Sequence, residues 1–489
     1  MKILTYHRAL FALLLSTLFM GIETNAQQSN SIYLMHGIPQ SSFLNPAVQI
    51  ECRWFLGIPG LSSSHVAYSN TAFTYRDLTE GESWNLEQVE SQMHRVDLYG
   101  SELSLQLLAL GYRHKSSYFS FSVDDRSHLY QTVPGKLAAT VVNGNYPAAG
   151  TYTAFNALKS YGTYFRQFTL GASRVLSRSL NVGIRLKLLF GKAGISSGRT
   201  DIGLYTDENN FDLLADGNYI MNTSFPLSVE QDAEGNITGI TINEINYASF
   251  FLNRGNPGVA IDLGIVYRYD PKLTLSASLL DVGGLRWRTD LNKLSSEGRF
   301  IYEALESSGD LTSMSFLEDM IDTLQSSFDV SVSQQAYFSL LPAQLFLGGS
   351  YQYKEHLSLG AVSRNLFLRS KLYSSFSLSA TADLNKRIFA TLSWSYLNRS
   401  IRNIGAVLAL QGKGFQFHLA SENLLGFFQP FDTRTIQFRA GFNVLFGCPG
   451  SKKEKLEADA YAGYPAGGNC SWSTQQKQRK KRYRRKVGL

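Results

Sequence analysis

The stretch Val182-Gly-Ile-Arg-Leu-Lys-Leu-Leu-Phe190 alternates large apolar side chains with glycine and basic side chains. Successive side chains of a β-strand point to opposite faces, so this alternation predicts a strand with one apolar and one polar face. Four further stretches alternate in the same way: 259–269, 375–384, 388–396 and 436–446. Each is about nine to twelve residues long, as a tilted membrane-crossing strand must be, whereas strands of soluble sandwiches are nearer five or six.

The connections between these stretches are of two kinds. Some are short turns, at 177–179, 270–272, 385–386 and 411–413, and others are long irregular stretches, at 127–160, 206–257 and 288–334. Short turns on one rim and long loops on the other are typical of an outer-membrane barrel. We therefore predict an all-β fold, a transmembrane antiparallel β-barrel of about 14 strands within a range of roughly 12 to 16. A large soluble β protein with one polar face is the alternative.

One segment of the chain has a different period. Between residues 300 and 328, apolar side chains recur at helical spacing, at Phe316, Leu317, Met320, Ile321 and Leu324. This spacing predicts a short helix, either in a loop or folded toward the lumen, that is too charged to span a membrane.

The N-terminus has the three parts of a secretory signal. Lys2, His7 and Arg8 form a basic region, the run 9–22 is apolar, and Thr24-Asn-Ala26 offers small residues to a signal peptidase. The apolar run is shorter than the ~20 residues of a spanning helix, so we expect cleavage after Ala26 rather than a membrane anchor. Export followed by barrel formation predicts a location in the outer membrane, in contact with its lipid.

The charge of the chain is unevenly distributed. The formal net charge is +7, yet residues 451–489 alone carry eleven Lys or Arg against three Asp or Glu. The body of the chain is therefore nearly neutral, which argues against a nucleic-acid partner. The basic tail predicts either a solvated end or contact with a periplasmic or secretion-system protein.

The polar face of the strands supplies candidate lumen-lining residues. If the apolar face meets lipid, the residues that point inward are Arg185, Lys187, Asp262, Arg268, Gln416, His418, Gln437 and Arg439. Because both signs of charge are present, we expect a hydrogen-bonded interior that holds a plug rather than a wide pore of a single sign.

Segments near the mature N-terminus carry a family resemblance. Tyr33-Leu-Met-His-Gly-Ile-Pro-Gln-Ser-Ser-Phe-Leu-Asn-Pro-Ala47, Trp54-Phe-Leu-Gly-Ile-Pro59 and Tyr68-Ser-Asn-Thr-Ala-Phe73 resemble an outer-membrane barrel family of Bacteroidota whose function is unknown. The resemblance extends from about residue 28 to 448. Asn-Pro-Ala and turns such as Asp281-Val-Gly are also similar to FadL-like barrels, which include fatty-acid transporters and PorV-type secretion proteins.

The FadL-like resemblance implies a 14-stranded barrel with an N-terminal plug, for which Asn45, Pro46 and Ala47 are the candidate plug residues. Pro46 has a fixed φ and biases Asn45 toward an extended conformation, which suits a sharp entry into a plug. The expected organisation is a signal peptide at 1–26, a plug segment at 27–62, a barrel at 63–448 and a basic periplasmic tail at 449–489.

No pattern of catalytic or metal-binding residues is present. The eight histidines lack ligand spacing, and we find no nucleophile motif, phosphate-binding loop or paired carboxylates. We therefore predict no cofactor, no metal and no enzymatic activity, and interpret His418 as a lumen-lining group rather than a catalytic base. Three cysteines allow one disulfide; Cys448 with Cys470 is nearest in sequence, and we leave open whether the two pair.

Two functions remain after these exclusions. The first is FadL-like transport or gated passage of a hydrophobic or small solute. The second is a structural or interaction barrel that anchors a secretion or surface-assembly complex. An enzyme built on the barrel is a distant third, because no residue can be assigned to catalysis.

Overall fold

The computed structural model describes residues 30–36, 38–80, 83–209, 212–231, 237–302, 329–369, 371–384, 387–412 and 414–448. The expected signal peptide, the helical pattern at 316–324, Cys470 and the basic tail lie outside these residues.

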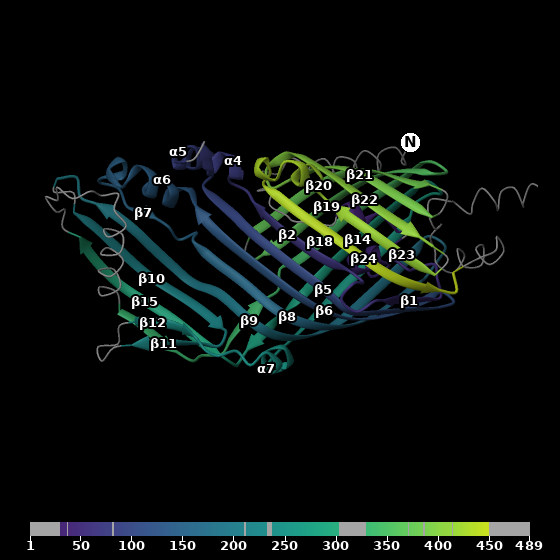
Figure 1. Ribbon diagram of the computed structural model, residues 1–489, viewed down its shortest axis with the longest axis horizontal. Coiled ribbons are helices and arrows are strands. Elements are labelled where there is room, and N and C mark those ends of the chain that lie inside the picture. The colour runs from purple at the N-terminus through teal and green to yellow at the C-terminus, as the bar shows by residue number, and fades with distance from the viewer. Residues whose placement is uncertain are drawn as a thin grey trace, which may run out of the picture.

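The strands form a closed antiparallel β-barrel of fourteen strands, which confirms the predicted fold class (Figure 1). Two short strands, β1 (Trp54–Gly57) and β2 (Ser64–Asn70), act as halves of one barrel strand, because each pairs with β5 on one side and β24 on the other. The other thirteen follow in chain order around the barrel: β5 (Val96–His114), β6 (Ser117–Pro134), β8 (Lys159–Val175), β9 (Leu180–Thr206), β13 (Asn256–Arg268), β14 (Leu273–Trp287), β18 (Ala343–Lys354), β19 (Leu357–Leu368), β20 (Lys371–Leu384), β21 (Ile388–Leu397), β22 (Ser400–Gln411), β23 (Phe415–Ser421) and β24 (Thr435–Phe446).

The two rims differ as the turn lengths predict. At the turn rim, short connections such as 115–116 and 355–356 join neighbouring strands, and β1 begins beside the end of β24. Most connections at the opposite loop rim are long, and several short elements lie there: α4 (Tyr75–Leu78), β3 (Thr79–Glu80), β4 (Ser83–Trp84), α5 (Leu86–Gln92), α6 (Gly135–Asn143), η1 (Tyr146–Ala148), β7 (Thr153–Ala154), α9 (Leu425–Phe428) and η2 (Pro430–Asp432).

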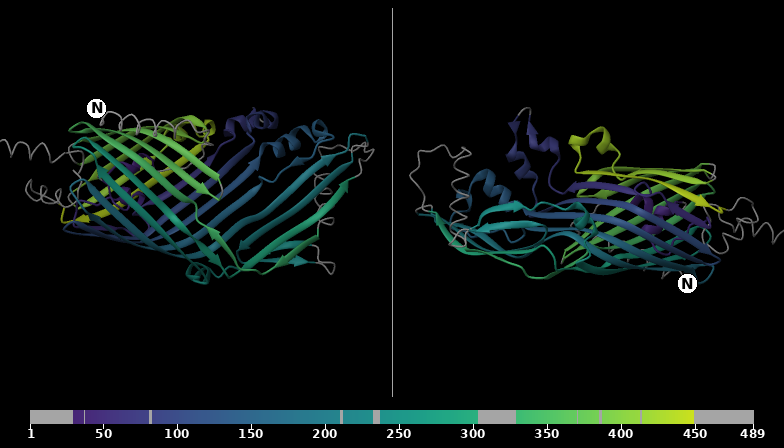
Figure 2. Two further views of the ribbon diagram at one scale, coloured as in Figure 1. Left: turned by 180° about the vertical axis from the view of Figure 1, so that it is seen from behind. Right: turned by 60° about the horizontal axis from the view of Figure 1, so that its bottom comes forward.

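A sheet continues from the barrel beyond the loop rim, within stretches that we expected to be irregular. Strand β9 is 27 residues long, and its second half pairs with β10 (Leu213–Ser224). Strand β15 (Leu291–Tyr302) adds to β10, and β16 (Asp329–Ser333) adds to β15. This extension sheet projects away from the barrel in both side views (Figures 1 and 2). The remaining elements are β11 (Leu227–Gln231), β12 (Ile237–Ile242), α7 (Tyr247–Leu252) and β17 (Tyr337–Leu340).

The apolar face of the barrel strands points outward. On β9, Leu186 is 59% exposed whereas its neighbour Lys187 is 7% exposed. The same alternation leaves a band of exposed apolar side chains around the barrel, including Val259, Leu392 and Phe438. Among the described residues, no helix is long and apolar enough to cross a membrane.

The interior of the barrel holds the N-terminal segment. Helices α2 (Asn30–Tyr33) and α3 (Pro39–Leu44) are almost entirely buried, and their apolar side chains pack against the inner wall. The ring of Tyr33 stacks on Phe346 of β18 with centroids 4.9 Å apart. This contact between plug and wall is part of the largest apolar cluster in the described chain. We call residues 30–51 the plug.

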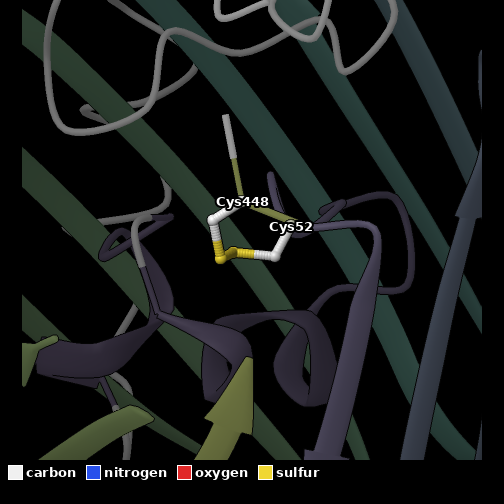
Figure 3. The surroundings of a disulfide bond; sticks show 2 residues. All are labelled: Cys52 and Cys448. Atoms are coloured by element: carbon white, nitrogen blue, oxygen red, sulfur yellow. A yellow bond between two sulfur atoms is a disulfide. The ribbon is translucent and has the colours of Figure 1, made fainter. Parts of the chain in front are cut away.

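A disulfide joins the two ends of the barrel (Figure 3). Cys52 lies just before β1, Cys448 lies just after β24, and their Cα atoms are 3.9 Å apart. The sequence left open whether Cys448 pairs with Cys470; in the structure Cys448 pairs with Cys52 instead. Closure of the barrel brings its first and last strands side by side, so Cys52 lies beside Cys448 despite a sequence separation of 396 residues.

Candidate functional site

The plug is held to the wall by polar contacts at its N-terminal end. The backbone amide and the hydroxyl of Ser31 both donate to the carboxylate of Glu422, each at 2.8 Å, and the hydroxyl lies 2.7 Å from that of Ser393 on β21. The side-chain amide of Asn30 donates to Ser377 Oγ on β20 at 2.8 Å. These groups are buried, so their hydrogen bonds satisfy atoms that would otherwise be costly inside the barrel.

The predicted plug residues Asn45, Pro46 and Ala47 lie against the opposite wall. Asn45 is extended (φ −141°, ψ 110°), and its side-chain amide lies within 3.3 Å of Tyr33 Oη and the carbonyls of Ile265 and Ala277. Its side-chain oxygen accepts a hydrogen bond from the backbone amide of Ala47. Asn45 therefore links the plug to β13 and β14 and sets the direction in which the chain leaves α3.

Two glycines of the wall allow the close approach of Asn45 and Pro46. A Cβ on Gly183 of β9 would lie 2.2 Å from the Pro46 carbonyl oxygen, and one on Gly264 of β13 would lie 2.3 Å from Asn45 Oδ1. Both glycines fall on the inward face of their strands, in the same phase as Arg185 and Asp262. Glycines among the inward-facing polar residues of a strand were the sequence signal that could have located the place where the plug contacts the wall.

A cavity of about 100 Å³ remains in the lumen beside the plug. Phe43 and Leu44 of the plug form part of its wall, and the rest is mostly polar. The charged side chains that line it are Glu102, Asp124, Arg126, Arg185, Lys187, Asp281, Arg364 and Arg439.

A buried ion network supports one side of this cavity. Asp262 pairs with Lys187 Nζ at 2.7 Å and with Arg185 Nε at 3.2 Å. Asp281 pairs with the same Lys187 at 2.6 Å and with Arg126 Nη1 at 2.9 Å. Asp262 therefore faces its partners on the neighbouring strand β9, and Asp281 faces its partners on strands farther around the barrel. Each charge has an opposite charge beside it, which offsets much of the cost of burying it.

Asp281 does not end a strand, contrary to our interpretation of Asp281-Val-Gly as a turn. It lies within β14, where it has a positive φ of 61° and the register between β13 and β14 shifts. Its backbone amide donates to Asp262 Oδ1 at 2.8 Å. The turn-favouring chemistry of Asp is expressed here as a bulge that directs its carboxylate into the lumen.

The remaining predicted lumen residues lie in separate places. Arg439 lines the cavity, whereas Arg268 lies at the turn rim and donates to the carbonyl of Arg178 at 2.8 Å. Gln416 and His418 are fully buried outside the cavity lining, and Gln437 contacts His65 at 3.2 Å. The sequence analysis missed five of the charged lining residues: Glu102, Asp124, Arg126, Asp281 and Arg364. It interpreted Asp281 as part of a turn, and it did not recognise the strands that carry the other four.

Comparison with solved structures gives similarity at low sequence identity. A TodX deltaS2S3 mutant monoaromatic hydrocarbon channel is 10% identical, with 84% of this chain and 94% of that chain covered and a TM-score of 0.41. The toluene transporter TbuX of Ralstonia pickettii is 12% identical over 87% and 96% of the two chains, with a TM-score of 0.40. A Pseudomonas aeruginosa FadL homologue is 10% identical over 88% and 99%, with a TM-score of 0.34.

No curated protein sequence matches the chain. Its family is nevertheless defined, because residues 46–422, more than half of the chain, match a single family along the barrel: the protein belongs to DUF5723, a family of unknown function.

Proposed function

We propose that the protein is an outer-membrane barrel that gives a small polar solute gated passage, with the plug as the gate. The outward band of apolar side chains and the length of the strands support the membrane location. The observation that carries the proposal is the plug itself, which lies in the lumen next to a polar cavity.

The way in which the plug is attached suits a gate. Many of its contacts with the wall are hydrogen bonds, and water can replace such bonds at a modest net free-energy cost of about 0.5–1.5 kcal/mol each. The Cys52–Cys448 disulfide fixes the chain at the turn rim directly after the plug. Residues 30–51 can therefore move while β1 stays paired with β24.

The lining of the cavity favours a polar solute over a hydrophobic one. Arg126, Arg364 and Glu102 border it, and an apolar molecule would exclude water from these charged groups without offering them hydrogen bonds. A polar solute can offer replacements, so its entry costs less.

A reversible cross-link tests the gate. The hydroxyls of Ser31 and Ser393 are 2.7 Å apart, so the double variant Ser31→Cys/Ser393→Cys should form a disulfide that pins the plug to β21. We expect the pinned protein in liposomes to admit small sugars or amino acids more slowly than the wild type in swelling assays, and reductant to restore the rate.

The matched control joins two wall strands without touching the plug. Thr381 and Thr391 have hydroxyls 2.8 Å apart on β20 and β21, so Thr381→Cys/Thr391→Cys adds an equivalent cross-link. Wild-type protein treated with the same reductant controls for the native disulfide. Equal swelling rates for the pinned protein, the wall-to-wall control and the wild type would rule out the plug as a gate.

A second candidate function is an interaction barrel that anchors a secretion or surface-assembly complex. The extension sheet favours it, because β10, β15 and β16 project beyond the loop rim and are not needed to close the barrel. Stoichiometric co-purification of a partner, lost when residues 208–255 or the basic tail 451–489 are deleted, would support this function over gated passage.

A further inference from the structure

Arg364 of β19 is a buried cation that faces the cavity. The residue is 1% exposed, its Nε donates to Gln344 Oε1 at 3.1 Å, and its guanidinium lies 5.8 Å from the centre of the Phe346 ring. Its Nη1 has no hydrogen-bond partner, and no carboxylate lies within ion-pair distance of Arg364 in the part of the chain that the structure describes. A guanidinium in such a place is costly unless an anion compensates it.

The acidic groups of the cavity are already engaged by other partners. Asp281 forms ion pairs with Arg126 and Lys187, as described above. Asp124 accepts hydrogen bonds from the side chains of Gln106, Gln167 and Ser122.

Glu102, the third acid of the lining, accepts from Tyr130 Oη at 2.5 Å. Among the charged lining residues, five are basic and three are acidic, and Asp262 behind the lining pairs with Arg185 and Lys187. The cavity therefore carries an excess of one positive charge.

We propose that this cavity binds a small oxyanion of the carboxylate or phosphate type, with Arg364 as its principal donor. The planar guanidinium can present two N–H groups to such an anion, and Arg439 of β24 lines the same cavity. The volume of about 100 Å³ exceeds the ~10–15 Å³ that one water needs, so a group of a few atoms fits. The inference rests on the proposed gated passage, for which it names the class of solute.

The variant Gln344→Glu separates binding from folding. The change is isosteric and places a carboxylate where Arg364 Nε already finds an oxygen at 3.1 Å. The cation then has a counter-charge within the protein, so the barrel should fold at least as stably as the wild type and yet repel an anion. Arg364→Gln removes the donor itself and is the second variant, because heat-dependent gel mobility can check that it folds.

The matched control is Gln335→Glu. The side-chain oxygen of Gln335 accepts from Lys293 Nζ at 2.9 Å, and both residues are outside the cavity lining. This variant makes the same chemical change beside a cation, but at an exposed position. Any effect of added negative charge on the whole protein appears in both variants.

Calorimetric titration of the full chain in detergent, at fixed ionic strength, measures the effect. The probes are sodium acetate, inorganic phosphate and, as a cation, tetramethylammonium. We expect the wild type to bind at least one oxyanion and not the cation, Gln344→Glu and Arg364→Gln to bind it at least about tenfold more weakly, and Gln335→Glu to stay within about twofold. Tighter binding of acetate would identify a carboxylate ligand, and tighter binding of phosphate a phosphate group.

Two results would overturn the inference: no binding of either oxyanion to the wild type, or wild-type affinity in Gln344→Glu. Both are measured without a membrane and with the plug in place. Oxyanion binding without plug-dependent flux would refute the gated passage alone. Plug-dependent flux without oxyanion binding would refute the oxyanion site alone.

Discussion

The contact between Ser31 and Glu422 makes the seating of the plug measurable. Glu422 is 3% exposed and accepts two hydrogen bonds from Ser31, both at 2.8 Å. In the variant Glu422→Gln, one acceptor oxygen becomes an NH₂ group, which then faces a donor. One charge-assisted hydrogen bond is lost, and a buried donor is left without a partner, at a cost of about 1–3 kcal/mol.

This cost falls on the seated state of the plug. Because 1.4 kcal/mol corresponds to a factor of ten, the unseated fraction should rise by roughly five- to 150-fold. Native-state hydrogen exchange of the protein in detergent, followed by mass spectrometry, reports that fraction. Amide protection in residues 30–45 should fall by a factor in this range, while protection in wall strands such as β8 should not change.

Glu355→Gln is the control for this experiment, because Glu355 is an exposed carboxylate in the turn between β18 and β19. If Glu422→Gln left the protection of residues 30–45 as in the wild type, the hydrogen bonds to Ser31 would not hold the plug in place. Equal loss of protection in the plug and in the wall strands would show that the variant destabilises the whole barrel and not the seat.

Two further predictions follow from the fold. Gly264→Ala should also unseat the plug and lower the amide protection of residues 30–45, since its Cβ would lie 2.3 Å from Asn45 Oδ1. Gly349→Ala is the control and should have little effect, because no heavy atom lies nearer than 3.6 Å to its Cβ. Cys448→Ser should lower the unfolding free energy by about 6 kcal/mol on the chain-entropy relation, since the lost disulfide closes a loop spanning a sequence separation of 396 residues. Cys470→Ser should unfold in urea as the wild type does.

The predictable part of this structure is what the chain encodes locally. Alternation along residues 182–190 is sufficient to assign a strand and its outward face, and Leu186 and Lys187 lie on the expected sides. The family resemblance at the N-terminus was also informative, since the matched family covers most of the region over which it was expected. The short turns at 177–179 and 270–272 could also be assigned from the local sequence.

The parts that sequence missed depend on which strands become neighbours. Cys52 and Cys448 meet because the barrel closes, and no local pattern encodes that closure. Asp281 and Arg126 come from strands that are not consecutive in the barrel order, so their ion pair crosses the lumen. Arg364 lies within β19, which was not among the alternating stretches recognised in the sequence.

The covalent attachment of the plug limits how a gate built from it can open. The disulfide holds Cys52 at the turn rim. Ile50, two residues earlier, packs there in one apolar cluster with Ala109 and Leu445. The cavity lies farther along the strands toward the loop rim, since its residues on β5 are 102–106 whereas β5 ends at 114. In the proposed mechanism a solute enters from the loop rim, reaches the cavity and meets the plug, which is tethered at the opposite rim. Movement of the plug toward the turn rim opens this route without displacing the solute, whereas movement toward the loop rim would force the plug through the cavity.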